Sequence, residues 1–431
     1  MMTKHDYASV GETLYRGILE NGLRIAVVPK PGYTRCFAMF ATDYGGADRR
    51  FALGGKFIDT PAGVAHFLEH KMFDMPDGDN ALTVLAANGA QPNAFTSGEM
   101  TAYHFESTES FFENLEMLLR FVQTPYFTEE SVKKEQGIIG QEIRMCEDSP
   151  DYAVYEETLK SLYEHNPTRE SVVGTVESIA EITPETLYDC HRIFYNPSNM
   201  CLCVVGDVEP ERVFETARAV VTAPAGETPQ RDYGAPEGET PLREKYERAM
   251  EVSAPQLIVG VKLTPPGKGE RLLRAKLTAS AAAACLFGTS SPFYSRLYGE
   301  GLINTDFSYG FDCTAGTFSF LLGGETREPE HVYDEVRGEL ARVRREGLDE
   351  GLFSRCKKAF YGSQIRALSS FYGLCASMAE AEFGRYNCLD SFAVLESVTA
   401  EDVMKFIREE LLPERMTMTL ITPAAGSPKE E

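Results

Sequence analysis

Three residues with metal-binding and acid–base chemistry stand at a notable spacing: His66, Glu69 and His70, in the order His-x-x-Glu-His. On a helix, side chains at i, i+3 and i+4 share one face, so both imidazoles can reach one metal ion beside the carboxylate. A catalytic zinc site needs such neutral nitrogen ligands, a third protein ligand and an open position for water. The alternative interpretation is an amphipathic helix with polar residues on a solvated face.

A third ligand must come from elsewhere in the chain, and residues 128–145 offer one. They are predicted to form a helix with Thr128 as N-cap, and Glu135 and Glu142 lie two turns apart on one face. Glu142 stands among isoleucines, where a charged group requires a partner. Zinc is one such partner, and an ion pair with Lys or Arg is the alternative.

Residue patterns also predict the elements that position these groups. Pro61 and Gly63 lead into the motif helix, and glycine pairs at 45–46 and 54–55 predict a loop before it. The predicted strands span residues 24–28, 36–41, 92–105 with a hairpin or bulge at Gly98, 200–205, 257–262 and 416–421. The predicted helices span residues 80–88, 110–121, 128–145, 184–194, 272–286, 349–383 with an interruption near Ser369, and 400–409.

The length of 431 residues predicts at least two domains. Residues 222–241 contain four prolines and three glycines without apolar periodicity, which indicates a linker. A shift of 216 positions carries Thr183 to Thr399, and the same shift carries a proline and a terminal strand onto their counterparts. We therefore predict a metal-bearing domain at 1–221, a linker at 222–244 and a related domain without the motif at 245–431.

The net charge of −23 argues against nucleic acid and against an anionic membrane surface, and it suits a basic peptide partner. We see no secretory signal in residues 1–10 and no apolar run long enough for a membrane span. Ten cysteines without a C-x-x-C pair indicate reduced thiols in a cytoplasmic protein. Cys190-His191, ahead of Cys201 and Cys203, offers a second metal site as an alternative, but the alternation of these two cysteines favours core packing.

The His-x-x-Glu-His order is the inverse of the common zincin motif, and with the later motifs the chain resembles the pitrilysin/insulinase family of zinc metallopeptidases. It looks closest to bacterial members of about this length. The matching segments are residues 92–96 (Pro-Asn-Ala-Phe-Thr), 135–142 (Glu-Gln-Gly-Ile-Ile-Gly-Gln-Glu), 143–150 (Ile-Arg-Met-Cys-Glu-Asp-Ser-Pro), 195–200 (Tyr-Asn-Pro-Ser-Asn-Met) and 204–207 (Val-Val-Gly-Asp).

The resemblance implies that His66, His70 and Glu142 ligate Zn²⁺ and that Glu69 is the general base on zinc-bound water. It also implies that Glu135 is a second carboxylate supporting catalysis. These roles agree with general chemistry, because zinc lowers the pKa of bound water toward ~7, where a carboxylate can take its proton.

The resemblance further implies a substrate-binding edge strand at Asn93, Ala94, Phe95 and Thr96, where an extended peptide adds by main-chain hydrogen bonds. An ordinary core strand is the alternative. One departure concerns the family's Arg and Tyr of the second half, whose expected positions hold Leu297 and Asn304.

The fold implied by the resemblance is α+β. It has two structurally related domains, each a mostly antiparallel sheet covered by helices, which together form half of a peptide chamber. We therefore predict a zinc endopeptidase for unfolded peptides that works as a homodimer or as a heterodimer with a paralogue. The alternatives are a non-catalytic subunit and a partner-dependent subunit that matures one specific peptide.

Overall fold

Most predicted elements form where the residue patterns place them in the computed structural model, which describes residues 2–424. Local capping explains several boundaries: the Asn80 side chain accepts from Leu82 N, and the Thr128 hydroxyl accepts from Ser131 N. The helices confirmed are α1 (Val64–Lys71), α2 (Ala81–Ala87), α3 (Phe111–Val122), α4 (Glu129–Asp148), α7 (Pro184–Phe194), α9 (Glu270–Phe287), α12 (Glu350–Ala367), α13 (Phe371–Gly384) and α15 (Ala400–Glu409).

One prediction of local structure is wrong, and one helix that positions the second sheet was not predicted. The segment predicted as a loop between the glycine pairs includes strand β5 (Arg50–Leu53), which turns at Gly54 and Gly55, both with positive φ, and pairs with β6 (Lys56–Asp59). Helix α5 (Pro150–Leu162) was not predicted, although the Ser149 side chain caps it and Pro150 opens it. Both features carry ordinary turn and cap signals.

The described residues form two compact units, each built from three segments of the chain. The first unit comprises residues 2–143, 171–233 and 365–389, and the second comprises residues 144–170, 234–364 and 390–424. In the part of the chain described, no helix is both long and apolar enough to cross a membrane.

The first unit is organised around a seven-stranded sheet of order β1-β2-β3-β9-β4-β8-β7. All neighbouring strands pair antiparallel except β3 and β9, which run parallel. The central strands β4 and β9 are buried along their whole length, as expected of a sheet covered on both faces. The strands are β1 (Thr3–Tyr7), β2 (Glu12–Ile18), β3 (Arg24–Pro29), β4 (Cys36–Thr42), β7 (Ala90–Thr96), β8 (Thr101–Ser107) and β9 (Met200–Gly206).

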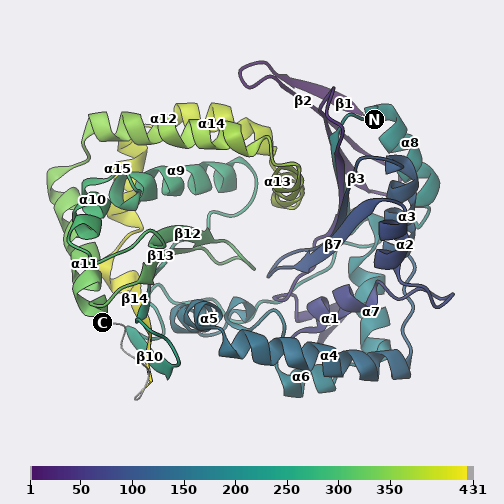
Figure 1. Cartoon of the computed structure of the whole chain (residues 1–431), viewed down its shortest axis with the longest axis horizontal. Helices are drawn as coiled ribbons and strands as arrows, with labels where there is room; N and C mark the ends of the chain where they lie inside the picture. Colours follow the sequence, from purple (N-terminus) through teal and green to yellow (C-terminus); the bar gives the residue numbers. More distant parts are fainter. Residues whose placement is uncertain (1, 425–431) are drawn as a thin grey trace. The chain divides into compact units, whose positions relative to one another are not determined.

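Helices cover the two faces of this sheet. Helices α3 and α8 (Pro210–Val220) lie on one face and α13 on the other (Figure 1). The Glu382 side chain of α13 accepts from Arg16 Nε at 2.7 Å, and its main-chain carbonyl accepts from Arg24. Strand β7 ends the sheet and pairs only with β8, so one of its sides has no strand partner in this unit.

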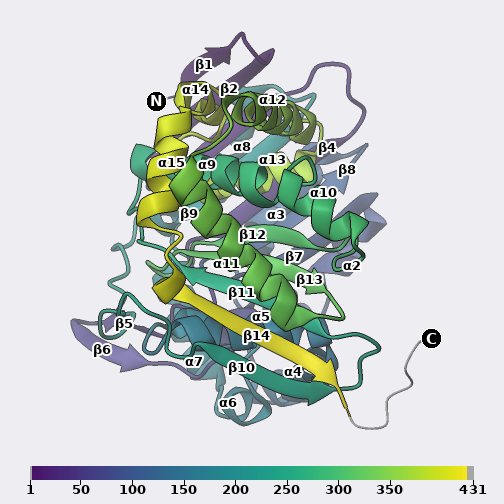
Figure 2. The same cartoon turned by 90° about the vertical axis from the view of Figure 1, so that its left-hand side faces the viewer.

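The second unit repeats this topology in a five-stranded sheet of order β10-β14-β11-β13-β12, whose strands lie side by side in Figure 2. Here β10 and β14 form the parallel pair and the other pairs are antiparallel. The strands are β10 (Lys245–Met250), β11 (Gln256–Lys262), β12 (Ser308–Asp312), β13 (Ser319–Glu325) and β14 (Met416–Pro423). The class is therefore α+β with two structurally related sheets, as the sequence predicted.

Each sheet is covered by a helix from the opposite half of the sequence. Helix α13, from the later half, packs on β9 and β4, whereas α5, from the earlier half, packs on β14 and β11. Gly260 of β11 permits the close approach of α5, because a Cβ there would lie 2.8 Å from the Thr158 side chain. The segments of the two units thus alternate along the sequence. The predicted boundaries 1–221, 222–244 and 245–431 instead divide the sequence into consecutive parts, and they stay a prediction.

Candidate metal centre

Helix α1 carries the motif and is fixed at its start by a glycine. Gly63 has φ of +87°, and a Cβ at this position would lie 2.6 Å from the Val173 carbonyl oxygen, so only glycine fits here. The helix buries Phe67 and Leu68 completely. This packing holds the helix in the interior, where His66 and Glu69 of the motif are each only 7% exposed.

The two histidines converge on Glu142 of α4. His66 Nε2 lies 3.5 Å from Glu142 Oε1, and His70 Nε2 lies 3.6 Å from Glu142 Oε2. Among the described residues, these three form a group of His, Cys, Asp or Glu side chains whose ligand atoms all lie within 4.8 Å of one another. The structure therefore sets Glu142 beside the two imidazoles rather than in an ion pair with Lys or Arg. Its side chain is 39% exposed, more than the apolar flanks suggest.

The donor set and its spacing fit a zinc ion. Two imidazole nitrogens and one carboxylate oxygen are zinc ligands of the catalytic kind. Separations of 3.5 and 3.6 Å are long for a hydrogen bond. Each runs to a different oxygen of the carboxylate, and each is close to the separation of about 3.4 Å expected between two ligand atoms that bind one ion with bonds of about 2.1 Å. The arrangement thus leaves room for an ion between the three side chains.

Glu135 lies outside the group of His66, His70 and Glu142 but forms a hydrogen bond with His70. Its Oε1 lies 3.1 Å from His70 Nδ1, a hydrogen bond that assigns the Nδ1 proton and leaves the Nε2 lone pair facing Glu142. Its Oε2 lies 3.9 Å from the ammonium of Lys71, which is only 1% exposed and also pairs with Asp74. Sequence reasoning missed Lys71, although a lysine next to buried Phe67 and Leu68 is a signal for a buried ion pair.

The electrostatics of these side chains follow from their contacts. Burial lowers the pKa of His70, but the hydrogen bond to Glu135 and the charges of the neighbouring carboxylates outweigh it and raise the pKa overall. The pKa of Glu142 is lowered, first by His66. Burial alone would raise the pKa of Glu135, and His70 and Lys71 reverse this and lower it. Both carboxylates are therefore ionised at neutral pH.

Strand β7 presents two different faces. Thr96 donates from Oγ1 to Glu69 Oε2 at 2.7 Å, so its side chain points toward α1. Phe95 points the opposite way, where its ring lies 6.2 Å from that of Tyr372 in α13. The Asn93 side chain accepts from Ala94 N at 2.9 Å. These four residues lie on an edge strand and not on a strand inside the sheet, and their role in substrate binding stays a prediction.

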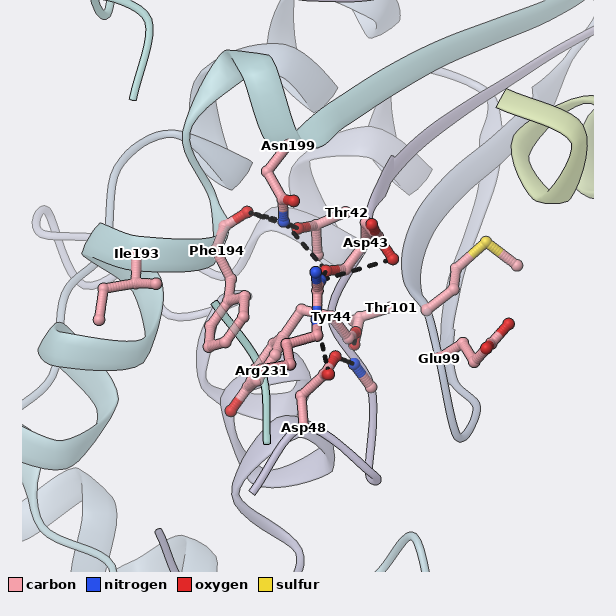
Figure 3. Close-up of polar contacts among 12 residues, drawn as sticks. Thr42, Asp43, Tyr44, Asp48, Glu99, Thr101, Ile193, Phe194, Asn199 and Arg231 are labelled. Atoms are coloured by element: carbon pink, nitrogen blue, oxygen red, sulfur yellow. Dashed lines mark hydrogen bonds and ion pairs between the residues drawn. The ribbon is translucent and has the colours of Figure 1, made fainter. Parts of the chain in front are cut away.

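A buried ion-pair cluster stands beside the turn that joins β7 to β8. Arg231, from the predicted linker, donates from Nε to Asp48 Oδ1 at 2.7 Å and also contacts Asp43 (Figure 3). Asp48 is 2% exposed and further accepts from Gly45 N and the Tyr233 hydroxyl. Burial raises the pKa of Asp48 to about 6 even though Arg231 lowers it. The linker is thus anchored in the first unit.

The cysteine–histidine segment is part of the core, as the sequence favoured. Cys190, Cys201 and Cys203 are buried free thiols. His191 Nε2 lies 3.0 Å from the Val122 carbonyl oxygen, and burial lowers the pKa of His191 to about 4, so it is neutral.

The positions that depart from the family's Arg and Tyr have structural roles. Leu297 is buried in the core of the second unit, and Asn304 Nδ2 lies 3.4 Å from Glu325. Arg296, a possible replacement, is paired with Glu335.

A helix-borne His-x-x-Glu-His motif, closed by a glutamate from a second helix beside an edge strand, is the arrangement of the inverted class of zinc-peptidase motif. Comparison with known proteins agrees. Residues 54–176 match the family described as insulinase (peptidase family M16), and residues 181–360 match the peptidase M16 inactive domain. An uncharacterized zinc protease of Bacillus subtilis, YmfH, is 38% identical over 98% of this chain and 100% of its own length. The chain belongs to the insulinase family, peptidase family M16.

Two further proteins are similar to this chain. The crystal structure of a putative M16-like peptidase from Alicyclobacillus acidocaldarius matches with a TM-score of 0.92 and 34% identity, over 96% of this chain and 99% of that chain. A probable mitochondrial-processing peptidase subunit beta of Arabidopsis thaliana is 28% identical over 39% of this chain and 33% of its own length.

Proposed function

We propose that the chain is a zinc-dependent endopeptidase that hydrolyses unfolded peptides. The observation that carries the proposal is the convergence of His66 Nε2 and His70 Nε2 on the Glu142 carboxylate at 3.5 and 3.6 Å, with Glu69 buried beside them. The relatives named zinc proteases support the choice of metal.

In this proposal, His66, His70 and Glu142 hold Zn²⁺, which when bound supplies Lewis acidity and lowers the pKa of water at the site. Glu135 fixes the ring of His70 by accepting a hydrogen bond from its Nδ1–H group, the usual arrangement around a histidine ligand. Glu135 then contributes to catalysis by orienting a ligand.

Glu69 acts as general base. It takes a proton from the attacking water as the water oxygen bonds to the scissile carbonyl carbon. The C–N bond then breaks, and Glu69 returns that proton to the leaving amine. A glutamate on the helix that carries both histidines is well placed for this transfer.

The substrate is proposed to pair with the open side of β7. The strand has only β8 as a partner, so an extended peptide can add there by main-chain hydrogen bonds beside Asn93, Ala94, Phe95 and Thr96. Because such pairing requires an extended chain, unfolded peptides are the expected substrates.

We propose a second chain as a partner, either an identical copy or a paralogue without the metal motif. In the resembled fold, four such units enclose a peptide chamber, and this chain has two units. The Arabidopsis relative is itself named as a subunit. Partner-dependent maturation of one specific peptide is the second candidate. Scattering at micromolar concentration is expected to give a dimer, and a compact monomer that still cleaves peptides would contradict this.

The proposed function is tested by zinc content and peptide cleavage. Wild-type protein is expected to bind one zinc per chain and to cleave a library of unstructured peptides. Glu69→Gln is expected to keep its zinc and to lose roughly 100-fold or more in kcat, whereas Glu130→Gln, an exposed glutamate early in α4, is expected to match wild type. Zinc absent from freshly prepared protein would sink the proposal, and unchanged cleavage by Glu69→Gln would remove Glu69 as base.

A further inference from the structure

The carboxylate of Glu69 has a specific hydrogen-bond donor. Thr96 Oγ1 donates to Glu69 Oε2 at 2.7 Å, a short distance typical of a charge-assisted bond. The Thr101 hydroxyl lies 3.4 Å from Thr96 Oγ1, a much longer and therefore weaker contact. The Thr96 hydroxyl therefore donates its proton to Oε2 of Glu69, the proposed base.

Thr101 is fixed in turn by a main-chain contact. It faces Thr96 across the hairpin in strand register and is fully buried. Its own hydroxyl donates to the Tyr44 carbonyl oxygen at 2.9 Å. Since that proton is engaged, Thr101 does not donate to Thr96 and leaves the bond to Glu69 undisturbed.

The loop that carries Tyr44 is held against the same hairpin. Gly46 N donates to the Ser97 carbonyl oxygen and Ala47 N donates to that of Gly98, each at 2.9 Å. Arg231 fixes the loop from its other side through Asp43 and Asp48 (Figure 3). The anchored loop therefore holds Thr101, whose partner across the hairpin is Thr96, the residue that donates to Glu69.

We infer that Thr96 is a positioning residue for Glu69 and that Thr101 supports it. This inference rests on the proposed function. A donor on Oε2 stops rotation of the carboxylate and leaves Oε1 to exchange the proton with water. Because Thr96 also belongs to the open edge strand, the residue that orients the base lies on the strand proposed to pair with the peptide. Binding and base orientation thus share one element.

The test compares Thr96→Val with Thr96→Ser. Valine keeps the shape and the strand preference but removes the donor, so kcat is expected to fall roughly 10- to 100-fold, with zinc content unchanged and KM within about twofold. Serine keeps the donor and is expected to restore kcat to within about threefold of wild type. Thr13→Val is the matched control, because it removes a similar bond, from Thr13 Oγ1 to Asp6, elsewhere in the same sheet.

Crystal structures of the two variants give a readout that does not depend on turnover. The Glu69 carboxylate is expected to leave its position in Thr96→Val and to keep it in Thr96→Ser. A wild-type kcat for Thr96→Val, a loss confined to KM, or an unmoved Glu69 would overturn the inference while Glu69→Gln still tests the proposed function. A zinc-loaded wild type that cleaves no peptide, either alone or with a candidate partner chain, overturns both.

Discussion

Replacing Glu135 tests how much a carboxylate behind a ligand contributes to metal binding. Glu135 accepts from His70 Nδ1 at 3.1 Å with a side chain only 14% exposed, so solvent screens the contact weakly. A hydrogen bond to an ionised group contributes about 1.5–3 kcal/mol. Removal of such a partner costs roughly 10- to 100-fold in metal affinity, which is about 1.4–2.7 kcal/mol.

The expected loss of zinc affinity depends on which residue replaces Glu135. Glutamine at position 135 can still accept from His70 Nδ1 through its amide oxygen, so Glu135→Gln loses the charge alone and is expected near ~10-fold. Alanine loses charge and acceptor, and also leaves buried Lys71 with one carboxylate fewer. Glu135→Ala is therefore expected toward ~100-fold.

Competition with a fluorescent zinc chelator at fixed pH measures these affinities directly. Glu130→Gln, which changes an exposed glutamate of the same helix, controls for net charge and is expected to bind zinc as wild type does. If Glu135→Ala binds zinc with wild-type affinity, or if Glu135→Gln is the weaker of the two, the assigned role of Glu135 is wrong.

Two further predictions follow from the described ionisable groups. The pKa of His70 is raised above the ordinary pKa of a histidine, so protonation of His70 stabilises the fold of the protein without zinc. This stabilisation is fully present at pH values below the ordinary pKa and is lost as the pH rises through the raised pKa. Zinc needs the neutral imidazole, so the zinc-induced increase in melting temperature is expected to be larger at pH 8 than at pH 6; an increase that shrinks over this range contradicts the assignment. Arg231→Met leaves Asp48 buried without its cation and is expected to destabilise the protein by about 3–5 kcal/mol in urea unfolding at pH 7.5. Because the pKa of Asp48 is already raised to about 6, the native state takes up a proton as pH falls, so the loss is expected to be smaller at pH 5.5 and to be partly restored by adding Asp48→Asn; equal losses at both pH values would refute this.

Local patterns predicted the site better than its surroundings. The i, i+3, i+4 spacing placed His66 and His70 on one face of α1, and the two-turn spacing placed Glu135 and Glu142 on one face of α4, as the structure shows. Helix periodicity is enough for such predictions, because the geometry within one helix is fixed by its sequence spacing. The pairing of α1 with α4 itself was supplied by the resemblance to a family.

Other features depended on contacts between residues distant in sequence. No local pattern indicates that Arg231 pairs with buried Asp48 or that Thr96 turns its hydroxyl to Glu69. Helix α5 had a readable start at Ser149, but its packing on β11 depends on Gly260, more than a hundred positions away. Such tertiary contacts are decided by shape and burial, which spacing does not encode.

Each sheet is covered by a helix from the other half of the sequence, and this arrangement has a consequence for synthesis on the ribosome. Strands β4 and β9 are buried along their whole length, and α13 covers one of their faces. At ordinary synthesis rates α13 emerges roughly ten to thirty seconds after β9. During this interval the newly made first sheet exposes apolar surface, a natural binding site for a chaperone. Expression of the first half alone therefore makes this transient exposure permanent.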